Sequence, residues 1–326
     1  MISRRRIVIA LGTGALAVPF ASFAQQQRKV WRIGVLWERA QSDYSPSLEA
    51  FKGGMRGLGY AEGKDYAIEQ RSAQNDLAHL PALMAELLAL KVNLIMVSGT
   101  PSAIAANNAT RDLPILIVTV SDPIVIGLAR SFLRPGGNVT GLTQDVGQDL
   151  GTKRLDLLTE IVPGMRRVGF LYNPENPTNL LILRQFEVDC GKLGLIPILT
   201  TIRNGDEVEA AFKILRRDRA QGLIVSAGST TTAFQDRIVE QAEKNRLPAV
   251  YAATAYTGLI TYGVNRDDLY RRVATYVDKI FKGAKPSDLP IEQPTKFDLV
   301  VNMKAAKALG LTIPNSILVQ ATKVVE

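Results

Sequence analysis

The chain has 326 residues, of which 46% are hydrophobic, with 39 basic and 31 acidic side chains, one cysteine and one histidine. The hydrophobic fraction excludes a disordered chain. The net charge of +8 comes without a block of lysine and arginine interleaved with aromatic residues, so nucleic acid is not an expected partner. One cysteine excludes an internal disulfide, and with one histidine it supports neither a zinc site nor a Cys–His dyad.

Residues 1–24 predict an export signal. A basic head is followed by an apolar stretch from Ile7 to about Ala21 and by small residues before Gln25. The stretch is too short to span a membrane. The run SRRRIVI also approximates a twin-arginine signal, so the general and the twin-arginine export routes both stay open. We therefore expect a mature protein located in the periplasm.

Strands and helices alternate through the first half of the mature chain. Residues 32–37 predict a strand, and a helix is expected from Ser45, where serine caps and proline follows, to Gly59. Residues 94–99 and 115–120 are continuous apolar runs, which are typical of parallel strands covered on both faces.

The alternation continues in the second half. Strands are expected at residues 167–173, 197–202, 222–228, 249–254 and 259–264. Asp206 and Glu209 predict a capping box at the start of one intervening helix. A helix is expected over residues 268–282, and a last strand and short helix follow a proline-rich segment. The pattern predicts the α/β class with doubly wound sheets.

The chain also repeats itself. RIGVLW at Arg32 is echoed by RVGFLY at Arg167, and LIMVSG at Leu94 by LIVSAG at Leu223. Two Rossmann-like lobes joined by a hinge of several strands are therefore expected, with a cleft between them. The predicted lobes are residues 25–145 plus about 265–295, and residues 146–264 plus about 296–326.

Ligands of doubly wound sheets bind at the carboxyl ends of the strands. Polar and aromatic residues at these ends are therefore the candidate ligand-binding residues. They are Trp37, Glu38, Tyr44, Gly99, Thr100, Ser121, Asp122, Asn173, Ser229, Tyr251 and Tyr262. For any one of them, helix capping is the competing interpretation, but their convergence on one cleft favours binding.

The candidates divide into three expected roles. Thr100, with the free N–H groups at the start of its helix, and Ser121 would hold an anionic end of the ligand. Asp122 or Glu38 would pair with a cation. The four aromatic rings would form walls, while the two second-lobe polar residues, Asn173 and Ser229, would close over the ligand.

Enzyme chemistry has little support in the sequence. His79 stands alone near a helix start, and Cys190 falls in step with the apolar positions of a helix. Neither a G-x-S-x-G elbow nor a phosphate-binding G-x-x-x-x-G-K-[ST] loop is present. We expect no catalytic site, metal or cofactor. Asp122 has no identifiable partner for acid–base chemistry, and a secreted hydrolase is a minor alternative.

Three runs carry a resemblance to a known family. GTPSAIAANNATRDLPILIVTVSDPIVIGLARSFLRPGGNVTG, TGLITYG and KGAKPSDLPIEQPTKFDLVVNMKAAKALGLTIPNSIL resemble the ABC-transporter substrate-binding proteins, whose members include tryptophan- and other aromatic-amino-acid-binding proteins. The resemblance covers essentially the whole mature chain. It implies a type I periplasmic-binding fold with three crossovers, and a monomer that delivers a small ligand to an inner-membrane ABC permease in transient contact.

Two departures from the family pattern concern the ligand. Thr257 stands where the family usually has glycine, and residues 226–230, SAGST, lack the acid that many relatives carry there. An amino-acid-like ligand and another carboxylate therefore both stay open. A ligand-sensing subunit of a signalling system is a functional alternative on the same fold. A sugar-type repressor is disfavoured because the chain begins with an export signal rather than a helix-turn-helix.

Overall fold

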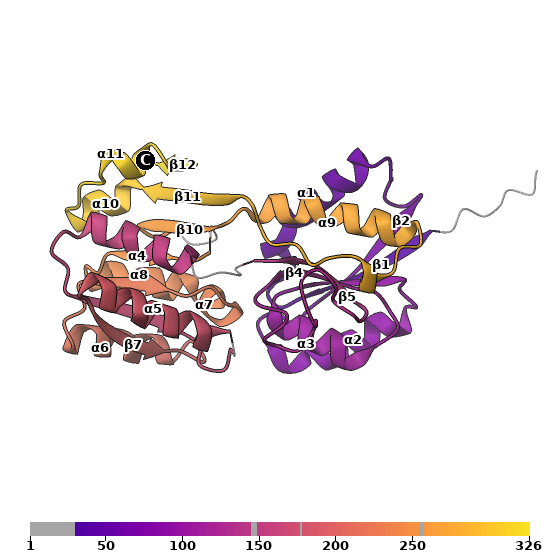
Figure 1. Cartoon of the computed structure of the whole chain (residues 1–326), viewed down its shortest axis with the longest axis horizontal. Helices are drawn as coiled ribbons and strands as arrows, with labels where there is room; N and C mark the ends of the chain where they lie inside the picture. The colour runs from indigo at the N-terminus through magenta and orange to yellow at the C-terminus, as the bar shows by residue number, and fades with distance from the viewer. Residues whose placement is uncertain (1–29, 145–148, 177, 254–256) are drawn as a thin grey trace, which may run out of the picture.

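The computed structural model describes residues 30–144, 149–176, 178–253 and 257–326, and shows two lobes lying end to end (Figure 1). The export signal predicted for residues 1–24 lies outside the described residues. Strands alternate with helices in both lobes, which confirms the predicted α/β class. No helix in the described ranges is long and apolar enough to cross a membrane.

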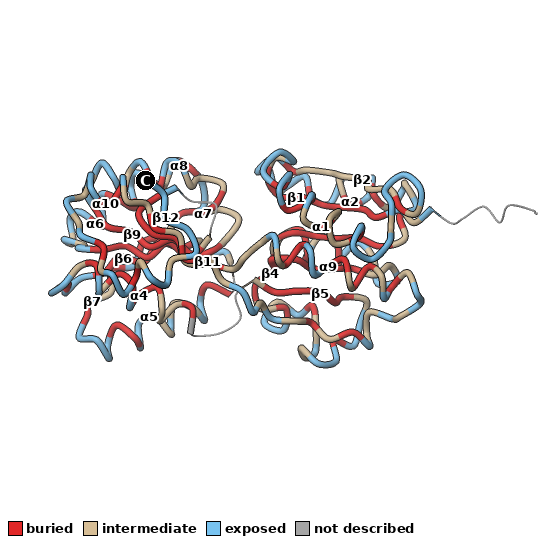
Figure 2. The backbone as a smooth tube through the Cα atoms, turned by 90° about the horizontal axis from the view of Figure 1, so that it is seen from above, coloured by how far each residue is buried: buried red, intermediate tan, exposed pale blue. Residues whose placement is uncertain are grey.

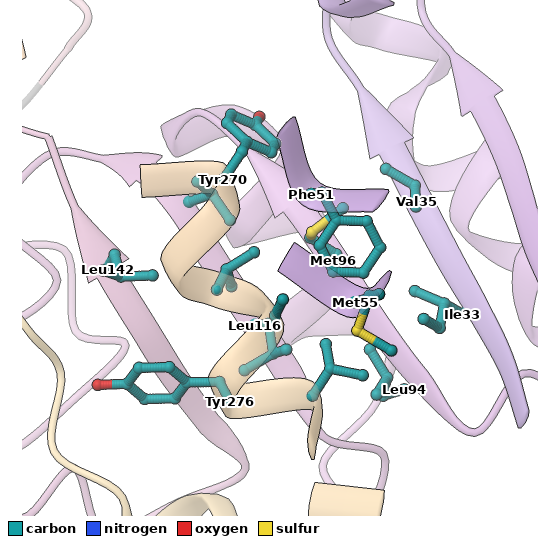
Figure 3. Packing of buried hydrophobic residues seen from close by; sticks show 14 of the residues in the cluster. Ile33, Val35, Phe51, Met55, Leu94, Met96, Leu116, Leu142, Tyr270 and Tyr276 are labelled. Carbon is teal, nitrogen blue, oxygen red and sulfur yellow. The ribbon is translucent and has the colours of Figure 1, made fainter. Parts of the chain in front are cut away.

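The sheet of the first lobe has five parallel strands in the order β2-β1-β3-β4-β5. They are β1 (Trp31–Trp37), β2 (Tyr66–Ser72), β3 (Leu94–Ser98), β4 (Ile115–Val120) and β5 (Val139–Thr143). Helices α1 (Ser45–Gly57) and α9 (Arg266–Phe281) cover one face, and α2 (Leu80–Ala89) and α3 (Thr100–Ala109) cover the other. In the first layer, Phe51 and Met55 of α1 pack near Ile33 and Val35 of β1 (Figure 3).

The sheet of the second lobe has seven strands in the order β12-β11-β10-β9-β8-β6-β7, and only β10 and β11 are antiparallel. They are β6 (Arg167–Tyr172), β7 (Ile196–Thr201), β8 (Gly222–Val225), β9 (Ala249–Tyr251), β10 (Ile260–Val264), β11 (Phe297–Asn302) and β12 (Lys323–Val325).

Helices also cover both faces of the second sheet, and its central strands β6, β8 and β9 are buried (Figure 2). One layer contains α4 (Asp149–Ile161), α5 (Asn179–Leu193), α10 (Met303–Leu309) and α11 (Asn315–Leu318). The other contains α6 (Glu207–Arg217) and α8 (Gln235–Lys244). The short helix α7 (Ser229–Ala233) follows β8.

The two sheets share one plan. The strands β7-β6-β8-β9-β10 repeat the order of the first sheet, so β6 takes the place of β1 and β8 that of β3. The sequence echoes noted above fall on these two pairs of strands, and the predicted repeat is therefore confirmed.

The chain passes between the lobes three times: after β5, after β10 and before β11. Helix α9 follows β10 of the second sheet but packs into the core of the first lobe. The chain then runs beside β5, where Leu142 pairs with Glu292, before it returns as β11. This arrangement has the several connections expected of the hinge, while the exact residue limits of the lobes stay a prediction.

Two local features differ from expectation. The edge strand β2 was not predicted, because its sequence, YAIEQRS, is largely polar. In the structure its residues are mostly only partly buried. The predicted capping box at the start of α6 is wrong. Asp206 makes no side-chain capping bond, and Asn204 Oδ1 instead accepts the N–H groups of Asp206 (3.0 Å) and Glu207 (3.3 Å).

Candidate functional site

The switch points of the two sheets face each other across one cavity, the cleft cavity. In a sheet of this order, ligands bind outside the carboxyl ends of the first and third strands. These ends are followed by Glu38 and by Gly99–Thr100 in the first lobe, and by residues 226–229 after β8 in the second. Six predicted residues line the cleft cavity: Glu38, Tyr44, Gly99, Thr100, Ser121 and Ser229.

Glu38 joins the two walls of the cleft cavity. Its side chain is buried, and Oε1 accepts hydrogen bonds from the N–H (3.0 Å) and Oγ (2.9 Å) of Ser102 in the first turn of α3. The other oxygen, Oε2, accepts a hydrogen bond from the hydroxyl of Ser229, at the start of α7 in the second lobe. Burial raises the pKa of the Glu38 carboxyl above its ordinary value, while these hydrogen bonds act in the opposite direction.

This position changes the expected anion site. The start of α3 was predicted to offer its N–H groups to a ligand anion. The Ser102 N–H is instead bonded to Glu38, whose carboxylate occupies that place. Thr100 still lines the cleft cavity, and its Oγ1 accepts the N–H of Ser121 at 3.4 Å.

Gly99 makes room for Glu38. Its φ is +97°, a backbone conformation that favours glycine, and a Cβ there would collide with the Glu38 carboxyl group. Gly228 holds the matching place before α7 but has a φ of 167°, which is extended backbone. A Cβ at Gly228 would make ordinary contacts of 3.6 Å and 3.8 Å with Thr231 and Asn176.

A β-bulge at the end of β4 shapes the same wall. The pairing of β4 with β5 shifts register between Ile117 and Val120, and Thr119 adopts a φ of +55°. Gly141 of β5 accommodates the bulge, because a Cβ there would collide with the backbone of Ile117. Thr119 Oγ1 lies 3.0 Å from Ser98 Oγ, and both hydroxyl groups line the cleft cavity.

Asp122 lies outside the cleft cavity. Its Oδ1 accepts the N–H groups of Ile124 (2.9 Å) and Val125 (3.2 Å), so its carboxylate caps the turn after β4. The residue lines a separate, largely apolar cavity beside α4 and α5. The expected pairing of Asp122 with a ligand cation is therefore not supported by its position.

Of the four aromatic residues predicted as walls, Tyr44 lines the cleft cavity. Its ring stacks on Trp37, which is fully buried, with the ring centroids 4.3 Å apart. Tyr251 is buried in the core of the second lobe, and Tyr262 packs against that lobe's other core layer. The strand pattern located these rings but not the directions in which they point.

Two arginines that were absent from the predicted site line the cleft cavity. Arg39 follows Glu38, and Arg266 begins α9. Their guanidinium carbons lie 5.1 Å and 5.5 Å from the centroid of the Tyr44 ring. Arg39 could have been suspected because it follows a strand end. Arg266 could not, because its place depends on α9 packing back onto the first lobe.

The second lobe contributes a neutral wall. Its lining residues include Ala227, Gly228, Thr232 and Asn176 beside Ser229. Asn173 lines a neighbouring cavity instead and donates a hydrogen bond to Thr230 Oγ1 at 2.8 Å. That neighbouring cavity shares Thr100 and Ser229 with the cleft cavity.

The cleft cavity therefore offers guanidinium, hydroxyl and amide groups around one aromatic ring. Across the described part of the chain, no cluster of three or more histidine, cysteine or acidic side chains is placed to hold a metal ion. His79 lies on the surface beside Asp76, and Cys190 is buried in the core of the second lobe. This arrangement suits reversible binding of a small polar molecule.

Comparisons with known proteins agree with this geometry. The family model described as "ABC transporter substrate binding protein" matches residues 45–325. A "Tyrosine-binding protein" of Clostridioides difficile is 26% identical over 273 residues, which cover 82% of this chain and 78% of that protein.

Solved structures share the fold. An ABC domain from Streptococcus pneumonia in complex with L-Trp superposes with a TM-score of 0.84 at 24% identity, covering 91% of this chain and 100% of that one. A substrate-binding protein with adhesive properties from Clostridium difficile, in a ligand-free open form, gives a TM-score of 0.70 at 27% identity, covering 91% and 99%.

Proposed function

The chain belongs to the family of ABC transporter substrate binding proteins, and from this membership we propose that its cleft cavity binds a small polar solute, amino-acid-like or another carboxylate. The protein would deliver that solute to an inner-membrane ABC permease. Members of this family bind solutes outside the cytoplasm, and the family is not an enzyme family.

One observation carries the proposal. The cleft cavity lies between the switch points of two sheets of the same order, and Glu38 of the first lobe is hydrogen-bonded to Ser229 of the second. A molecule in this cavity touches both lobes at once. Its binding energy therefore favours the arrangement in which the lobes are closed.

The proposal also includes the location of the protein, its oligomeric state and its partners. Residues 1–24 would direct export to the periplasm, by the general or the twin-arginine route, and would then be removed. The mature protein would act as a monomer that meets its permease transiently and binds no nucleic acid. The relatives named for tyrosine and L-Trp support a small solute that carries a carboxylate.

Intrinsic fluorescence gives a direct test of solute binding. The chain has two tryptophans, and Trp37 stacks on Tyr44 of the cleft cavity, whereas Trp31 stacks on Phe281 with centroids 4.4 Å apart. A Trp31→Phe variant therefore keeps the single tryptophan that adjoins the cleft cavity. When this variant is titrated with a panel of amino acids and organic acids, a compound that binds should change its tryptophan fluorescence until the site is saturated.

The same panel measured by calorimetry provides the control. A saturable heat with the same dissociation constant confirms that the optical change reports binding. If no compound of the panel gives either signal while the far-UV circular dichroism shows a folded protein, the proposed solute classes are wrong.

A further inference from the structure

We propose that the solute is an organic anion that lacks an ammonium group, rather than a zwitterionic amino acid. This inference rests on the proposed function and narrows it to a class of solute. The groups that line the cleft cavity carry it.

The charged groups of the cleft cavity favour an anion. Arg39 and Arg266 supply two guanidinium groups, and Glu38 is the single acidic residue of the described lining. Among the described residues, Arg39 makes one ion pair, with Asp43 at 3.5 Å, and Asp43 is itself partly exposed. Within the described part of the chain, Arg266 makes no ion pair. Each guanidinium group has five N–H donors, so both keep donors for a carboxylate.

The one carboxylate of the described lining is already bonded. Glu38 accepts hydrogen bonds from the N–H and hydroxyl of Ser102 and from the hydroxyl of Ser229, and it is 2% exposed. A ligand ammonium would have to replace the Ser229 bond that joins the lobes.

Other acids are not placed to help. Asp122 caps the turn after β4 and lies outside the cleft cavity. The wall after β8 is formed by Ala227, Gly228 and Ser229, which carry no charge. An α-ammonium group in the cleft cavity would thus lose its water and find no free carboxylate among the described lining residues. Burying an unpaired charge in this way costs free energy.

The Tyr44 ring, which lies near both arginines, indicates where the anion would bind. Both guanidinium carbons lie within 6 Å of the centroid of the Tyr44 ring, at 5.1 Å from Arg39 and 5.5 Å from Arg266. A carboxylate bonded to these groups would bring the rest of the solute against Tyr44. The solute thus has its carboxylate at the first lobe.

The test uses pairs of compounds that differ by the ammonium group. The pairs are hydroxyphenylpropionate with L-tyrosine, indolepropionate with L-tryptophan, and glutarate with L-glutamate, titrated by calorimetry into the full mature protein. In at least one pair we expect the acid without the ammonium group to bind at least about tenfold more tightly than its amino acid. Tyramine, a cation without a carboxylate, should not bind.

The outcomes separate the two proposals. If at least one amino acid binds and no acid binds at least about tenfold more tightly than its partner amino acid, the inference is wrong and the proposed function stands. If no acid of the panel binds, the inference is also wrong. If no amino acid binds either, the solute classes of the proposed function fail with it.

Variants then locate the anion. Arg266→Gln should weaken binding of the preferred acid at least about tenfold, as expected for hydrogen bonds to a charged group. Arg217→Gln removes the same charge from an exposed arginine outside the cleft cavity, and its affinity should be unchanged. Unchanged affinity in a folded Arg266→Gln variant would overturn the assignment.

Discussion

The two walls of the cleft cavity differ in kind although their sheets share one plan. The wall on the first lobe carries every charged group of the described lining, Glu38, Arg39 and Arg266, whereas the wall on the second carries alanine, glycine, hydroxyl and amide groups. Charged groups attract a solute at longer range than neutral ones. On the proposal made above, the first lobe would therefore select the solute by its charge, and the second lobe would complete its enclosure.

The walls also differ in how tightly their backbones are held. On the first lobe, Gly99 has a φ of +97° beside the Glu38 carboxylate, and Thr119 occupies a bulge. On the second lobe, Gly228 is extended and has space beside it. The charged wall is therefore the one whose shape has little tolerance for change.

Replacing the matched glycines should give the largest contrast. Gly99→Ala adds a Cβ that collides with the Glu38 carboxyl group in a strained conformation, so we expect a loss of about 3 kcal/mol in the free energy of unfolding together with loss of solute binding. Gly228→Ala should change the free energy of unfolding by less than about 1 kcal/mol. Urea unfolding and calorimetry measure both. Equal losses in the two variants would remove the contrast between the walls.

The buried acid of the charged wall should appear in the pH dependence of stability. The pKa of Glu38 is raised in the folded protein, so the folded state holds this proton more tightly than the unfolded state. The contribution of this proton to the free energy of unfolding is fully present below about pH 4.5, and it is lost as the pH rises through the raised pKa of Glu38. Urea unfolding from pH 4 to 8 should therefore show wild type losing stability relative to Glu38→Gln as pH rises.

The exposed Glu240 on α8 provides the matched control, because Glu240→Gln removes a carboxylate far from any buried network. The difference in free energy of unfolding between Glu240→Gln and wild type should not change with pH in the way expected for Glu38→Gln. A flat difference for Glu38→Gln as well would mean that Glu38 has no raised pKa.

The neutral wall should respond more mildly. Ser229→Ala removes the hydroxyl that donates to Glu38 across the cleft, and a hydrogen bond of this kind is worth about 1 kcal/mol. We expect solute affinity to fall by about fivefold because the solute dissociates faster, and stopped-flow fluorescence measures this dissociation rate. An unchanged dissociation rate would show that this bond does not contribute to closure.

Asp122 should give the smallest effect on binding. Asp122→Ala removes the acceptor of two turn N–H groups, so the free energy of unfolding should fall by about 1 kcal/mol while solute affinity stays the same. Calorimetry and urea unfolding separate the two quantities. A strong loss of affinity in a folded variant would place Asp122 in the binding site after all.

The sequence predicted the class of fold and the edge of the sheets at which the cleft cavity lies, because buried parallel strands and a repeated motif leave clear patterns. It also placed Glu38, Thr100 and Ser229, which follow strand ends within a few residues, at this edge. It did not show that Asp122 turns inward to its own backbone, since that depends on local loop geometry. Arg266 could not be found because its place is set by packing between segments far apart in the chain.

That packing has a consequence for how the protein is made. Helix α9 is synthesised after most of the second lobe, yet it covers one face of the first sheet, where Tyr60 also donates a hydrogen bond to Asp278 at 2.9 Å. The first lobe therefore cannot complete its core when its last strand, β5, has been made, and must wait until α9 has followed as far as Phe281. The second lobe in turn needs β11, α10, α11 and β12, which follow α9 in the chain, so neither core has all its elements until the last part of the chain has been made.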